Sequence, residues 1–148
     1  MDNETKSMTI LLAEDDDGHA LLVQERFEEC GVKNPLLRFG DGQAAWDFIS
    51  GRAENGESYL LLLDIRMPRL DGVEVLRRIK QDPRLRNMPV IMLTTTDDPK
   101  EIDLCYGLGC NNYLTKPVEF EKFSEVIRRL GLFLMVVKVG PLKKAWDD

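Results

Sequence analysis

Three carboxylates of this chain each follow an apolar run of strand length. Glu14 and Asp15 come directly after residues 9–13, and Asp64 comes directly after residues 59–63. Carboxylates within a few ångströms of one another repel, so such a group either holds a proton or binds a divalent cation. Mg²⁺ takes oxygen ligands and shares its coordination with phosphate oxygens. If the three acids meet in space, their chemistry is that of a magnesium-dependent phosphate site.

A hydroxyl and an amine stand in the same position after two further apolar runs. Thr94 closes the run 89–94, and Lys116 closes the run 111–116. An ammonium group neutralises charge on phosphoryl oxygens, and a hydroxyl can hydrogen-bond one of them. Both side chains therefore suit the same site as the acids.

The acids have distinct expected roles around the cation. We expect Asp15 and Asp64 to bind Mg²⁺ directly, Glu14 to act through water, and the backbone carbonyl of Arg66 to supply another oxygen. One oxygen of Asp64 then stays free to attack phosphorus, as carboxylates do in aspartyl-phosphate chemistry. The alternative is that the acids after the first run cap the following helix. This explains the two aspartates after Asp15, but not the lysine and threonine that arrive from two further segments.

Strand and helix patterns alternate five times along the chain. The expected strands are residues 9–13, 35–39, 59–63, 89–94 and 111–116, and the expected helices are residues 19–30, 42–50, 71–81, 99–108 and 119–130. This alternation predicts an α/β fold, a (βα)5 parallel sheet with helices on both faces. In the flavodoxin-like, doubly wound order 2-1-3-4-5, the first and third strands are neighbours. Glu14 and Asp15 would then lie beside Asp64, with Thr94 and Lys116 at the rim.

Composition limits the domain count and the classes of partner. The chain has 148 residues, of which 43% are hydrophobic, enough for one core. Its formal net charge of −6 argues against a nucleic-acid-binding surface. The N-terminus lacks the apolar core of a signal peptide and no apolar run is long enough to span a bilayer, so we expect a cytoplasmic protein without a membrane partner. The three cysteines suit reduced thiols, and the single histidine, His19, is expected to be a surface or packing residue.

An apolar extension follows the last expected helix. We expect residues 1–8 to be disordered, residues 9–131 to form the folded domain, and residues 132–148 to form this extension. Its stretch 132–139 is rich in β-branched residues and would add or exchange a strand with a second copy, as a dimerisation arm. The alternative is that it packs back on its own domain.

The chain resembles the receiver domain of response regulators in two-component signalling. The match covers residues 9–130 and uses each signature position in order. The matching positions are the acidic pair Glu14-Asp15, the phosphoacceptor segment Asp64, Met67-Pro68 and Asp71-Gly72, the switch residues Thr94 and Tyr113, and the pair Lys116-Pro117. The stand-alone layout and the apolar extension resemble the subgroup associated with bacterial phytochrome kinases.

The resemblance implies a single-domain response regulator whose partner is a sensor histidine kinase, in this subgroup a bacteriophytochrome. The kinase's phosphohistidine would pass its phosphoryl group to Asp64, and the output would be protein association. Thr94 and Tyr113 would reorient and change the face formed by the fourth helix, fifth strand and fifth helix. A homodimer through that face, through residues 132–139 or through both is expected. The resemblance also implies a cis peptide before Pro117 and restricted access to the phosphoryl group at Thr95.

Other functions remain as alternatives. A phosphorelay intermediate would pass the phosphoryl group on to a histidine phosphotransfer protein. A magnesium-dependent phosphatase of the haloacid-dehalogenase type needs a second acid two residues after the nucleophile, where this chain has Arg66. A flavodoxin would place its phosphate loop after the first strand, where this chain has four acids that repel phosphate. We therefore expect a signalling protein and not an enzyme.

Overall fold

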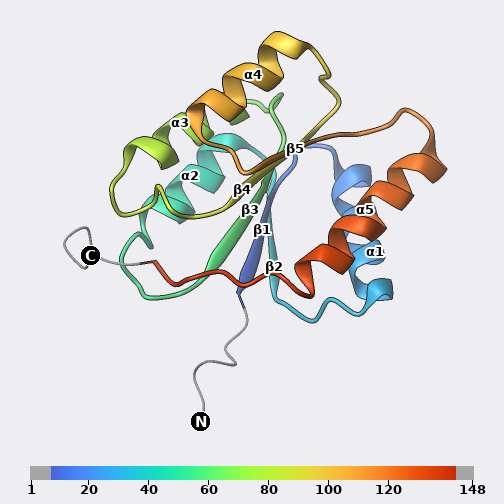
Figure 1. Ribbon diagram of the computed structural model, residues 1–148, viewed down its shortest axis with the longest axis horizontal. Coiled ribbons are helices and arrows are strands. Elements are labelled where there is room, and N and C mark those ends of the chain that lie inside the picture. Colours follow the sequence, from blue (N-terminus) through green and yellow to red (C-terminus); the bar gives the residue numbers. More distant parts are fainter. Residues whose placement is uncertain (1–7, 143–148) are drawn as a thin grey trace.

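The computed structural model describes residues 8–142 (Figure 1). Residues 1–7, expected to be disordered, and residues 143–148, the end of the expected extension, lie outside the described residues. Met8 is buried, and its carbonyl accepts a hydrogen bond from Asn34 Nδ2 at 3.0 Å. None of the helices in the described part of the chain is both long and apolar enough to cross a membrane.

Five parallel strands form one sheet in the order β2-β1-β3-β4-β5. The predicted fold and strand order are confirmed. The strands are β1 Thr9–Ala13, β2 Leu36–Phe39, β3 Tyr59–Leu63, β4 Val90–Thr94 and β5 Asn112–Thr115. The helices are α1 Asp17–Cys30, α2 Gly42–Ser50, α3 Gly72–Gln81, α4 Pro99–Leu108 and α5 Phe120–Leu134.

Helices cover both faces of the sheet. Figure 1 shows α1 and α5 on one face and α2, α3 and α4 on the other. All five residues of β3 are buried, as are all five of β4, which is why their sequences are apolar without alternation. Successive side chains of β3 point to opposite faces, so Leu61 and Leu63 pack with α2 and α3, while Leu60 and Leu62 pack with α1 and α5.

The register of the central strands places their last residues side by side. Ala13 at the end of β1 pairs with Leu63 at the end of β3, and the Asp64 amide donates to the Ala13 carbonyl at 3.1 Å. Whatever follows these strands is therefore held at one edge of the sheet.

Four of the five helices begin at an aspartate whose side chain accepts a backbone N–H; these caps are Asp16, Asp41, Asp71 and Asp98.

The first turn of α3 lies very close to the end of β3. The Gly72 amide donates to the Ile65 carbonyl at 2.7 Å. A Cβ atom on Gly72 would lie 2.0 Å from the Asp64 carbonyl oxygen and 2.9 Å from Ile65 Cα. Only a residue without a side chain fits here, which explains the glycine after Asp71.

The apolar extension differs from the expected arm. Helix α5 ends at Leu134, four residues later than predicted, because Leu134 is buried and Gly131 lies against Phe27. Val137 packs partly against the cluster between α1 and α5. Leu142 is buried, and its amide donates to the Glu57 carbonyl at 2.8 Å. Within residues 132–142 no strand forms, and Leu134, Val137 and Leu142 of this stretch pack on the same domain.

Two cysteines belong to the core cluster on the α2, α3 and α4 side of the sheet. Cys105 on α4 and Cys110 just before β5 are both buried and free, as expected of reduced thiols. Burial raises the pKa of the Cys105 thiol to about 11, and it also raises the pKa of the Cys110 thiol. Both side chains therefore act as small apolar groups of the core.

Candidate functional site

The three predicted acids meet at the edge of the sheet formed by the ends of β1 and β3. Carboxylate oxygens of Glu14, Asp15 and Asp64 lie within 4.8 Å of one another. Glu14 and Asp64 are buried, whereas Asp15 is exposed. An oxygen-only donor set of this kind suits a hard divalent cation such as Mg²⁺.

Lys116 arrives at the same cluster from the end of β5. Its backbone N–H donates to the Thr94 carbonyl at 2.7 Å, and its side chain is only 2% exposed. The Lys116 ammonium donates to Glu14 Oε1 at 2.5 Å and to Asp64 Oδ2 at 3.1 Å. The second oxygen of Glu14 accepts the Asp16 amide at 3.1 Å. The predicted convergence of lysine and acids is therefore present.

Burial is the largest cause of the raised pKa of the Glu14 carboxyl. It raises the pKa of this carboxyl from 4.5 to about 7; the Asp64 charge adds to the increase, and the bond to Lys116 opposes it. Desolvation outweighs the ion pair because both partners are almost removed from water. Glu14 is thus a group whose charged form is costly unless a cation is near.

We expect the pH dependence of stability to differ between the wild type and Glu14→Gln. The folded wild type binds more protons than the unfolded chain between pH 4.5 and about 7, so Glu14 lowers the free energy of unfolding as pH rises through this window. The variant lacks this decline, which should be on the order of 2 kcal/mol. Urea unfolding of both proteins at the two ends of the window measures it. Parallel pH profiles would contradict the prediction.

Thr94 ends β4, the strand next to β3, and its hydroxyl is unpaired. Its side chain is fully buried, and its Oγ1 has no hydrogen-bond partner within residues 8–142. A buried hydroxyl without a partner costs free energy, so its presence calls for an explanation. An incoming phosphoryl oxygen would supply the missing partner.

Tyr113 on β5 is half-buried and tied to the loop after β4. Its hydroxyl donates to the Thr96 carbonyl at 2.7 Å. Burial raises the pKa of the Tyr113 hydroxyl to about 12, so this group stays protonated and remains a donor. The contact links β5 to the loop that begins just after Thr94.

Two hollows lie next to the cluster. Asp15 and Arg66 line one of about 490 Å³. The exposed Thr95 instead lines the other, of about 530 Å³, together with Lys116 and Pro117. The Arg66 side chain reaches across the surface, with its Nε 3.5 Å from Thr96 Oγ1.

The peptide bond before Pro117 is trans, so the cis peptide implied by the resemblance is not found. For a bond before proline the two forms differ by only about 0.5–1 kcal/mol, with trans favoured. Lys116 reaches the acids with the trans bond.

A family comparison identifies the chain. The sequence profile of the response regulator receiver domain matches residues 10–128. The chain belongs to this family. Receiver domains are signalling domains that are phosphorylated on an aspartate and bind Mg²⁺ at an acidic pocket, and this receiver domain has such a pocket. Membership favours neither the phosphatase nor the flavodoxin alternative.

Relatives of this receiver domain include phytochrome response regulators. It is 34% identical over 135 residues to the response regulator Rcp1 of Synechocystis sp., covering 89% of this chain and 92% of Rcp1. The structure of a receiver domain from Rhodospirillum rubrum is 42% identical with a TM-score of 0.89, covering 93% of this chain and all of that one (100%). The structure of the phosphorylated cyanobacterial phytochrome response regulator RcpA is 28% identical with a TM-score of 0.82, covering 90% of this chain and 99% of the RcpA chain. The solved form of Rcp1 is bound to Mn²⁺, and it matches at a TM-score of 0.81 over 89% and 98% of the two chains.

The receiver domain also has a site neighbour that sequence reasoning assigned to surface or packing. His19 Nδ1 lies 3.1 Å from Lys116 Nζ, and its ring meets Phe123 edge-on with the centroids 5.1 Å apart. Its position three residues after the cap Asp16 puts it in the first turn of α1, next to the edge that carries the acids. That position was the available signal, but it does not say which way the ring points.

Proposed function

We propose that Asp64 of this receiver domain accepts a phosphoryl group from a sensor histidine kinase. The convergence of Glu14, Asp15, Asp64 and Lys116 from three strand ends supports this most directly. Asp15 and Asp64 would hold Mg²⁺, Glu14 would act through water, and the Arg66 carbonyl would complete the oxygen set. The bound cation would reduce the repulsion between the acids and the incoming phosphate.

Each side chain then has a role in the transfer. Asp64 Oδ1 accepts the Ile65 amide at 2.7 Å, which orients the carboxylate. An Asp64 oxygen attacks phosphorus, the bond to the donor's histidine nitrogen breaks, and the imidazole leaves. Lys116 neutralises charge on the equatorial oxygens, and the Thr94 hydroxyl gains its hydrogen-bond partner there.

The same contacts suggest how the signal leaves the site. Thr94 moving toward a phosphoryl oxygen would shift the loop whose Thr96 carbonyl holds Tyr113. Tyr113 would then reorient, and the face formed by α4, β5 and α5 would change. Thr95, exposed at the rim beside Lys116, would restrict access to the phosphoryl group. Among residues 8–142 no specific contact favours onward transfer in a phosphorelay.

The proposed kinase partner is a bacteriophytochrome. Support comes from the relatives, which include Rcp1, RcpA and bacteriophytochrome response regulators. We place this signalling in the cytoplasm and propose protein partners in place of nucleic acid, in keeping with the net charge of −6.

A labelling experiment tests the proposed function. With Mg²⁺ and acetyl phosphate, or with a phosphorylated kinase, the wild type should gain one acid-stable, base-labile phosphoryl group. Asp64→Asn should gain none, because an amide oxygen is a poor nucleophile. Asp17→Asn, at an exposed position of the same acidic run, should label like the wild type. Equal labelling of Asp64→Asn would refute the proposal.

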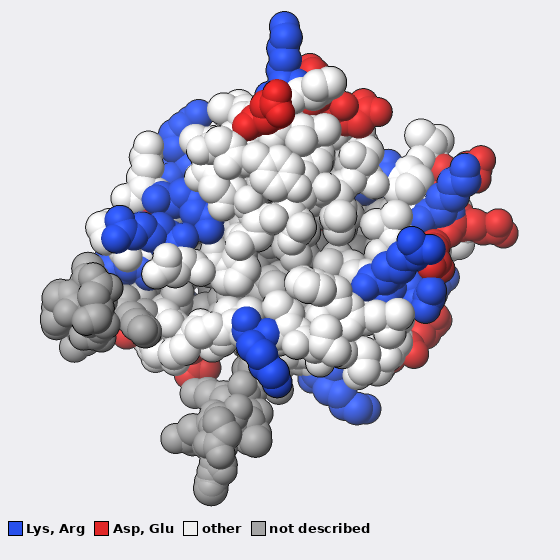
Figure 2. Space-filling view, in the orientation of Figure 1, with Lys and Arg blue, Asp and Glu red and all other residues white. Residues whose placement is uncertain are grey.

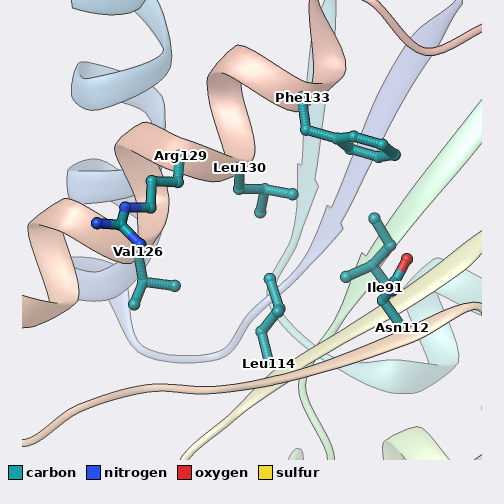
Figure 3. A pocket seen from close by; sticks show the side chains of 7 residues that line it. All are labelled: Ile91, Asn112, Leu114, Val126, Arg129, Leu130 and Phe133. Carbon is teal, nitrogen blue, oxygen red and sulfur yellow. The ribbon is translucent and has the colours of Figure 1, made fainter.

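We also propose a homodimer through the face of α4, β5 and α5. Figure 2 shows that the surface between α4 and α5 is largely uncharged, with charged side chains at its margins. A hollow of about 330 Å³ opens there between α5 and the edge strand β5, and Figure 3 shows the side chains that line it. Phe133, which lines this hollow, is 45% exposed. Large apolar groups gathered on one face are typical of an interface.

Phe133→Glu should weaken this dimer. A charge placed among apolar side chains at the centre of an interface typically raises the dissociation constant about tenfold or more. Leu21→Glu, at an exposed leucine of α1, is the control and should leave association unchanged. Sedimentation equilibrium before and after phosphorylation measures both. A monomeric wild type in both states would rule out the dimer.

A further inference from the structure

The Lys116 ammonium has a third partner that lies outside the acidic cluster. An ammonium group has three N–H donors. Two of them face Glu14 and Asp64, and within residues 8–142 the third neighbour at hydrogen-bond distance is His19 Nδ1 at 3.1 Å. Because Lys116 is almost completely buried, a donor without a partner there would be costly.

We propose that His19 is a positioning residue that holds the Lys116 ammonium for phosphoryl transfer, an inference that rests on the function proposed for Asp64. For Nδ1 to accept, the neutral ring must carry its proton on Nε2. Nε2 lies 3.9 Å from Asp16 Oδ2, and the His19 side chain is 35% exposed. A proton on Nε2 therefore lies on the side of a carboxylate oxygen, as this tautomer requires.

The ring of His19 is held from two helices. It belongs to the first turn of α1, which Asp16 caps through the His19 amide at 3.0 Å. On its other side the edge-on contact with Phe123 of α5 restricts its rotation. His19 is thus fixed by the packing of α1 on α5 and does not depend on the acidic cluster for its position.

This independence gives His19 a distinct role. A cation at the acids and a phosphoryl group on Asp64 would both draw charge away from the two carboxylates that bind Lys116. Of the three acceptors, His19 alone is neither a proposed metal-site acid nor the phosphoacceptor. It would keep one N–H of Lys116 occupied throughout and leave the other two directed at the phosphoryl oxygens.

Two substitutions separate positioning from packing. His19→Met keeps an apolar side chain against Phe123 but removes the nitrogen acceptor, whereas His19→Gln keeps an acceptor oxygen. With Mg²⁺ and acetyl phosphate, His19→Met should show a rate constant at saturating donor about tenfold lower, the loss expected for one bond to a charged group. Its half-saturating donor concentration and its Mg²⁺ affinity by calorimetry should stay within about twofold. His19→Gln should recover most of the rate.

The outcomes distinguish this inference from the proposed function. If the wild type labels on Asp64 and His19→Met is equally fast, the role of His19 is refuted and that of Asp64 stands. If His19→Gln is as slow as His19→Met, the acceptor is not what matters and the inference also fails. If the wild type does not label on Asp64, the proposed function fails, and the inference fails with it.

Discussion

Gly72→Ala is expected to lower the free energy of unfolding by about 3 kcal/mol or more. The added Cβ would lie 2.0 Å from the Asp64 carbonyl oxygen, and this oxygen belongs to backbone that cannot rotate away. Relief requires α3 to move off the end of β3, which breaks the 2.7 Å bond from the Gly72 amide to Ile65. Urea unfolding followed by circular dichroism measures the loss.

Gly107→Ala provides the matched control. This glycine lies on the exposed side of α4, and nothing lies within 4 Å of a Cβ atom built on it. Alanine is favoured over glycine in a helix by about 1 kcal/mol, so this variant should be more stable than the wild type. A Gly72→Ala protein within 1 kcal/mol of the wild type would show that the close approach is easily relieved.

Lys116→Met should destabilise the metal-free protein by about 3 kcal/mol near neutral pH and above, and saturating Mg²⁺ should restore most of this loss. Without the ammonium group, Glu14 and Asp64 face each other in a buried site with no cation. Mg²⁺ replaces the missing charge, and in the variant it has no ammonium to displace. Thermal unfolding with and without Mg²⁺ measures the difference.

Lys80→Met is the control for the loss of a partly buried lysine. Lys80 Nζ donates to the backbone carbonyls of Arg86 at 3.0 Å and Met88 at 2.7 Å, and neither contact involves the acidic cluster. This variant should also lose stability, but its gain on adding Mg²⁺ should equal that of the wild type. If Lys116→Met gains no more than the wild type, Lys116 and the cation do not share the site.

Most of the fold could be predicted because its elements carry unambiguous patterns. Strand β3 is apolar at every position and is buried at every position, as a central parallel strand must be. Glycine and proline stand between many of the segments and mark where they end. The predicted strand and helix bounds therefore agree with the structure to within two residues for all elements except the end of α5. Once the strand order was set, the convergence of Asp15, Asp64 and Lys116 followed from the parallel direction of the strands.

The remaining features depend on packing that no local pattern records. The helix expected over residues 119–130 continues to Leu134, because Leu134 is buried beyond the predicted end. The form of the bond before Pro117 depends on a free energy difference of about 1 kcal/mol, below what sequence reasoning resolves. The orientation of His19 depends on the ring of Phe123, which lies 104 residues further along the chain.

The buried Cys105 thiol on α4 can report motion of the face formed by α4, β5 and α5. Cys105 is fully buried and its pKa is about 11, so an alkylating reagent can attack it near neutral pH only while α4 lifts from the sheet. Cys30 is only half-buried and would first be changed to serine. The alkylation rate of Cys105 would then report that opening without any added label. Mass spectrometry could then measure how acetyl phosphate changes the rate at which α4 opens in the otherwise native chain.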